Sequence, residues 1–254
     1  MLYGFDKKIG EFKTLAKNNR LSQSYIFYGD PQIGKAAFAR QLAVFLETGE
    51  FVAATKILTD FLEIEPEPDK EAIGIEAANS VREFLFQKPF ISSRRTVIVP
   101  EAERLTDEAQ AALLKIVEEP PRESLIILIL PNPEFLTAAL VSRCQKIYFP
   151  RLSWKELETF LVRDFKIEPA AAKKAAIASF GRLGRALALI GYNDTKVSGP
   201  GDYFEKKIIA GWEKMAAGAG SGKMAWLLAR EAAIGRLNLN VGLQQRAAEE
   251  FFNG

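Results

Sequence analysis

The stretch SYIFYGDPQIGKAAF, residues 24–38, decides the fold, because an apolar strand, a glycine loop and the start of a helix follow one another in it. From Gly29 to Lys35 it matches the first seven positions of the phosphate-binding pattern G-x-x-x-x-G-K-[ST]. The eighth position, where that pattern has a hydroxyl that holds Mg²⁺, is Ala36. The stretch therefore predicts the architecture of a phosphate-binding loop that lacks the hydroxyl ligand for Mg²⁺. The alternative is an ordinary strand-to-helix turn.

On both sides of this stretch, apolar strands alternate with amphipathic helices up to about residue 150. We expect strands at 24–29, 60–65, 95–100, 125–130 and 145–150, and helices at 4–18, 34–47, 75–87, 106–118 and near 133–140. Continuous Ile, Leu and Val runs that are separated by helices are typical of a parallel sheet with both faces covered. The pattern predicts a three-layer α/β/α fold of the nucleoside-triphosphatase type.

The pattern changes after FPRLS, residues 149–153, where the strands stop. Ser153 is a candidate N-cap with Glu156 at the capping-box position, which predicts a small helical module. The glycine-rich stretch GYNDTKVSGPGDY then separates a last helical segment. We therefore expect three parts: an α/β domain over 1–150, a helical lid over 151–195 and a short C-terminal helical segment over 196–254.

Composition excludes several kinds of site. The 254 residues include no histidine and one cysteine, Cys144, so disulfides within the chain, multi-cysteine zinc sites and histidine-based catalysis are excluded. A net charge of +2 predicts no general attraction to nucleic acid. The longest apolar run, from Ser124, has the length of a strand, and the first ten residues lack the apolar core of a signal peptide. We expect a cytoplasmic protein with no membrane contact.

The stretch VIVPEAERLTDEAQAALLKIVEEPP, residues 97–121, bears on hydrolysis. A working site ends this strand with an acid that holds Mg²⁺, followed by a glutamate that positions the attacking water. Here Pro100 stands at the metal-holding place and Glu101 follows it. Without a metal, Glu101 has the alternative interpretation of a solvated carboxylate at a helix N-terminus. We expect no metal site.

Four stretches carry a family resemblance: GDPQIGK, VIVPEAERLTDEAQAALLKIVEEPP, LPNPEFLTAALVSRCQKIYFPRLS and GRLGRAL. Together they resemble the AAA+ subunits of the bacterial DNA polymerase III clamp loader, most closely the delta-prime group, over roughly residues 5–192. The resemblance implies a stator in a ring-like pentamer, beside a gamma/tau motor subunit and a delta subunit, that acts on the sliding clamp and primer-template DNA. The segment after residue 195 is shorter than the usual collar domain of that family and is read as a condensed collar. Its Trp212, Trp226 and Phe251 are core or interface candidates.

In this family the tripeptide SRC supplies an arginine finger to the ATP of the adjacent subunit, so the resemblance implies that role for Arg143. A planar guanidinium can neutralise the charge that spreads over the γ-phosphoryl oxygens. The alternative is a structural salt bridge at a helix end. Cys144, next to Arg143, is expected to be a small buried apolar residue.

Two further places of the family's working sites are also substituted. Pro131 stands where motor subunits have a polar residue, and Gly184 stands at the place of the lid arginine, with Arg185 one position later and therefore turned about 100° around the helix. We expect no hydrolysis and no bound cofactor, with at most weak nucleotide binding by Gly29, Gly34, Lys35 and Glu101. An active gamma/tau-like ATPase and a non-replicative AAA+ regulatory module remain alternatives. Candidate DNA contacts are Arg82, Arg94, Arg95 and Arg104, unless they form a solvated basic surface.

Overall fold

The computed structural model describes residues 3–64, 66 and 72–190. These lie in the first of the two compact units into which the chain divides, Met1–Asp194. The expected C-terminal segment over 196–254, including Trp212, Trp226 and Phe251, lies outside the described residues. The three-part division of the chain therefore stays a prediction.

The described part is built on a five-stranded parallel sheet with the order β2-β3-β4-β1-β5. The strands are β1 (Ser24–Tyr28), β2 (Phe61–Glu63), β3 (Arg95–Val99), β4 (Ser124–Leu130) and β5 (Gln145–Tyr148). In the register of the central pair, Ser24 lies opposite Ile126 and Tyr28 opposite Leu130. The parallel sheet expected from the alternation is confirmed.

Up to β5 the helices alternate with the strands in the expected order, and a group of helices comes after β5. They are α1 (Asp6–Lys17), α2 (Lys35–Thr48), α3 (Ile75–Leu85), α4 (Asp107–Glu118), α5 (Ala138–Arg143), α6 (Trp154–Phe165), α7 (Pro169–Ala178) and α8 (Leu183–Leu189), with 3-10 turns η1 (Ala102–Arg104) and η2 (Pro133–Phe135).

One expected helix is wrong. The predicted helix near 133–140 is divided into η2 and α5, because Leu136 and Thr137 have extended ψ angles of 156° and 141°. The backbone N–H of Thr137 donates to the side-chain oxygen of Gln110 on α4 at 2.8 Å. This bond to another helix replaces the helical bond that residue 137 would otherwise make.

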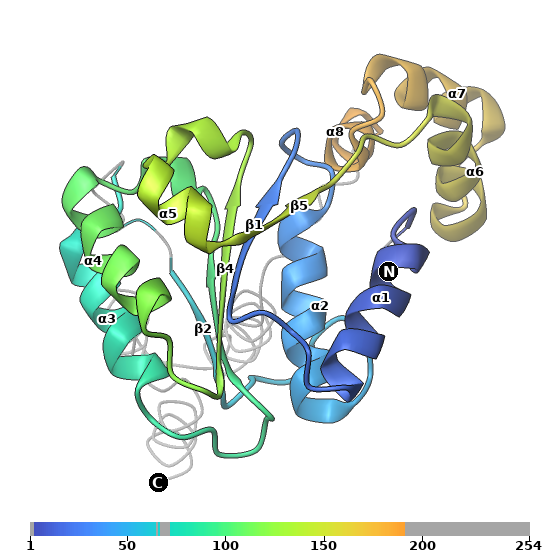
Figure 1. Ribbon diagram of the computed structural model, residues 1–254. Helices are drawn as coiled ribbons and strands as arrows, with labels where there is room; N and C mark the ends of the chain where they lie inside the picture. The colour runs from blue at the N-terminus through green and yellow to red at the C-terminus, as the bar shows by residue number, and fades with distance from the viewer. Residues whose placement is uncertain (1–2, 65, 67–71, 191–254) are drawn as a thin grey trace, which may run out of the picture. The chain divides into compact units, whose positions relative to one another are not determined.

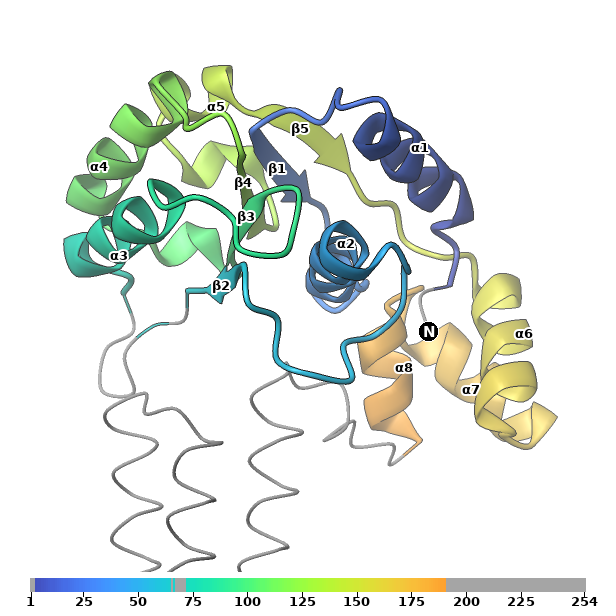
Figure 2. The same ribbon diagram turned by 90° about the horizontal axis from the view of Figure 1, so that it is seen from below.

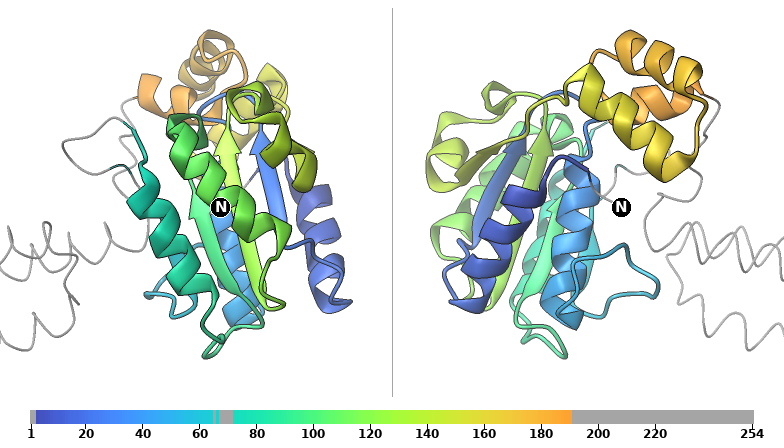
Figure 3. Two further views of the ribbon diagram at one scale, coloured as in Figure 1. Left: turned by 60° about the vertical axis from the view of Figure 1, so that its left-hand side comes forward. Right: turned by 90° about the vertical axis from the view of Figure 1, so that its right-hand side faces the viewer.

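The helices cover both faces of the sheet, α3, α4 and α5 on one side and α1 and α2 on the other (Figure 1; Figure 2, seen from below). Side chains alternate between the two layers, since Ile26 packs with the α3–α5 side and Phe27 with the α1–α2 side. On β4 all seven residues are buried. Figure 3 shows the two covered faces in turn. The three-layer α/β/α fold is confirmed.

The chain continues after β5 into the lid, defined here as helices α6, α7 and α8. As predicted, Ser153 and Glu156 form a capping box at the start of α6. The lid has a core of its own, which includes Leu157, Phe160 and Ala176. None of the helices in the described ranges combines the length and the apolar character that a membrane span requires.

Candidate functional site

The predicted phosphate loop, residues 29–34, lies at the carboxyl ends of the strands, where ligands of open parallel sheets bind. It leaves the end of β1, and the N–H of Gly29 donates to the carbonyl of Pro131 at 3.1 Å. Gly29 has a φ of +136°, and a Cβ there would lie 2.3 Å from the carbonyl oxygen of Phe149. Only glycine fits this position.

Gln32 occupies a left-handed conformation in the loop, with φ of 62°. A side chain with a Cβ pays about 1–2 kcal/mol for that conformation. Many phosphate loops have glycine at this place, which adopts the same conformation without that cost. Gly34, with φ of 104°, then leads into α2.

Lys35, the first residue of α2, is bound to its own loop. Its Nζ donates to the carbonyls of Gly29 at 2.5 Å and Asp30 at 2.6 Å, and the residue is 7% exposed. Burial lowers the pKa of Lys35 to about 8, although the negative charges of Glu103 and Asp30 oppose this shift. The ammonium group that would meet a phosphate is thus held by backbone carbonyls.

The two acids that follow β3, Glu101 and Glu103, have different surroundings. Glu101 has an exposed side chain and pairs with Arg104 at 3.0 Å. Glu103 acts electrostatically on Lys35, and its Oε2 is buried without a hydrogen-bond partner in the described part of the chain. Burial raises the pKa of Glu103, the charge of Glu101 raises it further, and Lys35 opposes the shift. The sequence signal for Glu103 is weak, because it depends on how the η1 turn directs successive side chains.

The two metal-holding places carry apolar residues. Ala36 packs against the aromatic core under α1 and α2, and Pro100 directly follows the last residue of β3. Across residues 3–64, 66 and 72–190, no three Asp, Glu, His or Cys side chains gather in a group that could hold a metal ion. How this chain treats Mg²⁺ stays a prediction.

The lid contacts the loop directly at Gly184, whose N–H donates to the carbonyl of Gln32 at 2.8 Å. A Cβ on Gly184 would lie 3.1 Å from the Cβ of Gln32 and 3.2 Å from its carbonyl oxygen. An arginine, the residue expected at this place in a working lid, would therefore displace α8 or the loop.

A second contact joins the loop to the segment that enters the lid. Arg151 donates to both carboxylate oxygens of Asp30, at 2.5 and 2.8 Å. This hydrogen bond lowers the pKa of Asp30, and the charges of Arg151, Arg182 and Lys35 lower it further against the effect of burial. The loop is thus held from two sides.

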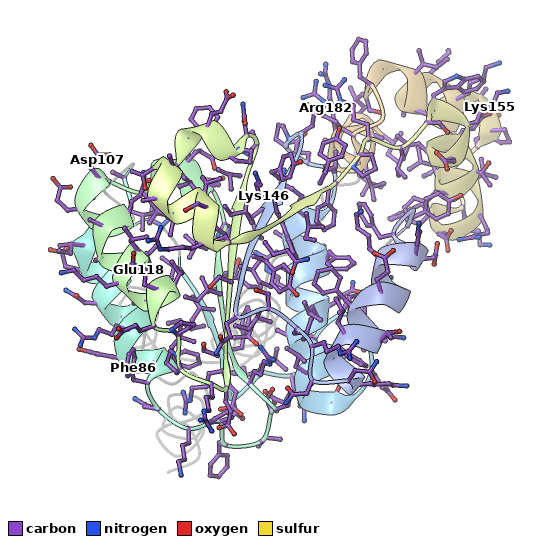
Figure 4. The ribbon with its side chains drawn as sticks, viewed as in Figure 1. Phe86, Asp107, Glu118, Lys146, Lys155 and Arg182 are labelled. Atoms are coloured by element: carbon purple, nitrogen blue, oxygen red, sulfur yellow. The ribbon has the colours of Figure 1, made fainter. Side chains whose placement is uncertain are left out.

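Arg182, the N-cap residue of α8 that is labelled in Figure 4, also acts on the loop, and sequence reasoning missed it. Its charge acts on Asp30, and its Nε is buried without a hydrogen-bond partner among the described residues. Arg185 is exposed and lies over the ring of Phe180 at 5.7 Å. This agrees with the expectation that one step along the helix turns Arg185 elsewhere.

Arg143 is the last residue of α5, at the surface of the α/β layer. Its Nη1 donates to the carbonyl of Ala139 at 3.1 Å and the hydroxyl of Ser142 at 3.2 Å. Its Nη2 lies 2.7 Å from Oε1 of Glu118, the last residue of α4, with side-chain exposures of 42% for Arg143 and 39% for Glu118. The salt bridge of the alternative interpretation is present, while the guanidinium stays accessible.

The candidate DNA contacts differ among themselves. The prediction that Arg94 lies at the surface is wrong. Its side chain is buried, since the residue is 7% exposed, and it donates to the carbonyls of Leu21, Ser22 and Ser124. Arg95 lies 3.8 Å from the Asp60 carboxylate and over the ring of Phe84.

The other two candidates lie beside neighbours on their own segments. Arg104 pairs with Glu101, and Arg82 lies 5.7 Å from the ring of Phe86. A DNA contact by Arg82 or Arg104 therefore stays a prediction.

Comparison with known proteins gives one family match and several relatives. Residues 5–153 match the family described as DNA polymerase III, delta subunit. The chain is 36% identical over 130 residues to DNA polymerase III subunit delta' of Escherichia coli K12, covering 51% of this chain and 39% of that protein. It is 29% identical over 185 residues to subunit tau of the same organism, covering 67% of this chain and 29% of tau. The chain thus spans less than half the length of these two relatives.

Among solved structures, the Holliday junction branch migration motor RuvB of Thermotoga maritima has a similar fold. The TM-score is 0.53 at 17% identity, over 94% of this chain and 83% of RuvB. Identity at this level is evidence for the fold alone. The likeness supports the α/β/α fold described above.

Proposed function

Because this chain belongs to the family of delta-prime-like subunits of the DNA polymerase III clamp loader, we propose that it is a non-catalytic stator that donates Arg143 to a neighbouring subunit's ATP. One observation carries the proposal: Lys35 is 7% exposed and bound to its own loop, whereas the Arg143 side chain is 42% exposed at the end of α5. The first charge is directed inward and the second is available to a partner.

The chain's own loop lacks what hydrolysis requires. Ala36 and Pro100 offer no oxygen ligand for Mg²⁺, and phosphoryl transfer depends on a metal to neutralise the developing charge. Gly184 packs on Gln32 at the place of the lid arginine. ATP binding by Gly29, Gly34, Lys35 and Glu101 is weak at most in this proposal, and no cofactor is required.

Arg143 has the properties of a finger supplied in trans. Its guanidinium is always charged, is planar and can offer two parallel donors to phosphate oxygens. Such an arginine contributes about 10³–10⁵ in rate when it reaches the γ-phosphoryl group. The proposed acceptor is the ATP of a gamma/tau motor subunit.

The remaining partners follow from the same proposal. The chain joins a hetero-oligomer with the motor and delta subunits, and through that complex it acts on the sliding clamp and primer-template DNA in the cytoplasm. Its own contribution is to hold the ring and to complete one ATP site. A mass measurement in solution should show a monomer alone and a larger complex when the other loader subunits are added.

The decisive experiment is Arg143→Ala in a reconstituted clamp-loader complex. We expect the clamp-stimulated ATPase of the site that this subunit faces to fall by about 10³ or more, with folding and assembly unchanged. Arg122→Ala, which removes an exposed arginine from the turn before β4, is the matched control. An unchanged rate for Arg143→Ala would show that the finger assignment is wrong.

A working motor is the second candidate, because tau is 29% identical to this chain over 185 residues. It predicts ATP turnover by the pure, isolated protein in the presence of Mg²⁺. The stator proposal predicts none. A turnover that survives in Arg143→Ala and is lost in Lys35→Ala would favour the motor.

A further inference from the structure

We infer that Glu118 is a positioning residue for Arg143, which holds the guanidinium at the subunit surface in the orientation from which it meets a neighbour's ATP. The inference rests on the proposed function, since it assigns a second residue to the same device. The inference is drawn from the 2.7 Å contact between Nη2 of Arg143 and Oε1 of Glu118, which joins the ends of α5 and α4.

The two helix ends are held at a fixed separation. The start of α5 is bound to α4 by the hydrogen bond from the N–H of Thr137 to Gln110, a side chain that is 4% exposed. Between the two ends, Leu140 of α5 shares one buried cluster with Leu113 and Val117 of α4. Glu118 and Arg143 therefore face each other because of the packing of their helices.

The contacts leave part of the guanidinium available. Arginine has five N–H donors in a planar fork. The carbonyl of Ala139, the hydroxyl of Ser142 and the carboxylate of Glu118 use up to three of them, all on Nη1 and Nη2. The other N–H groups can donate to phosphate oxygens while Glu118 keeps the plane of the group in place.

Positioning is a better account of this pair than stabilisation of the fold. Both side chains are about two-fifths exposed, and exposed ion pairs add little to stability because water screens them. A long arginine side chain is costly to immobilise, since it has many rotamers. Because Glu118 restricts the rotamers of Arg143 in the free subunit, less side-chain entropy is lost when the neighbouring subunit docks.

The test is Glu118→Gln in the reconstituted complex, with the clamp-stimulated ATPase measured over a range of ATP concentrations. We expect kcat to fall about fivefold, with KM for ATP unchanged. This factor corresponds to the upper end of the free energy that an exposed ion pair contributes. Glu119→Gln, the neighbouring exposed glutamate, should leave both constants unchanged and is the matched control. Glu118→Asp should restore part of kcat, because it restores the charge.

A double-mutant cycle separates positioning from any other role of Glu118. In an Arg143→Ala background, Glu118→Gln should have no further effect, because its only route to the ATP is through Arg143. A fivefold loss that persists in that background overturns the inference, and so does an unchanged kcat in the native background. If Arg143→Ala itself is without effect, the proposed function fails and this inference fails with it.

Discussion

The loop at 29–35 and the corner where α4 meets α5 both carry a cation, but they present it in opposite ways. Lys35 is 7% exposed and donates to two carbonyls of its own loop, while the Arg143 side chain is 42% exposed and pairs with a carboxylate at the surface. The difference teaches that the loop uses its cation for internal contacts. The α4–α5 corner keeps its cation accessible.

Apart from the ATPase assays, the largest effect is expected at Cys144, next to Arg143. Burial raises the pKa of this thiol to about 11, so the reactive thiolate at pH 8 is about a hundredfold scarcer than for a free cysteine. Modification by a maleimide in the native protein should be slower by about that factor, and should become fast in guanidinium chloride. A fast reaction of the native protein would show that the corner between α4 and α5 opens, and that the Cys144 thiol is accessible as well as the Arg143 guanidinium.

The next effect is expected where the lid meets the loop. Gly184→Ala adds a Cβ at 3.1 Å from the Cβ of Gln32, which is closer than an ordinary van der Waals contact. The substitution should therefore lower the free energy of unfolding by about 1–3 kcal/mol. Gly10→Ala is the control, because nothing lies within 4 Å of a Cβ at that helical position.

The control should stabilise the protein by about 0.5–1 kcal/mol, through helix propensity alone. Thermal and urea unfolding check both variants. If Gly184→Ala were as stable as the native protein, the lid would not be held against the loop at this point.

The smallest effect is expected at the Asp30–Arg151 pair. Because the hydrogen bond from Arg151 lowers the pKa of Asp30, the pair stabilises the fold above about pH 4 and loses that contribution as pH falls through the lower pKa of the folded state. Asp30→Asn should cost under about 1 kcal/mol at pH 7, since the pair is partly exposed.

Urea unfolding of both proteins at several pH values checks this dependence. The difference between Asp30→Asn and the native protein should shrink below pH 4. A difference that stays constant down to about pH 2 would contradict the assigned cause.

The sequence predicted the loop better than its surroundings. The glycine loop after β1 and the displaced Arg185 followed from local rules about backbone and helix geometry, and both agree with the structure. The sequence singled out Glu101 as the candidate acid of the site, whereas Glu103, in the short η1 turn, is the acid whose charge acts on Lys35. Arg94 was expected at the surface and lies inside, where it donates to three carbonyls from two segments that are distant in the chain.

By itself, the sequence determined which chemical groups exist: a glycine loop after a buried strand, a lysine, no hydroxyl at Ala36, no acid at Pro100 and no histidine anywhere. These are covalent facts, and they limit the chemistry however the chain folds. The tertiary structure decided which groups meet, including Glu118 with Arg143 and Gln32 with Gly184. Those pairs join segments that are distant in the chain, so they depend on how helices pack on the sheet and not on any local pattern of residues.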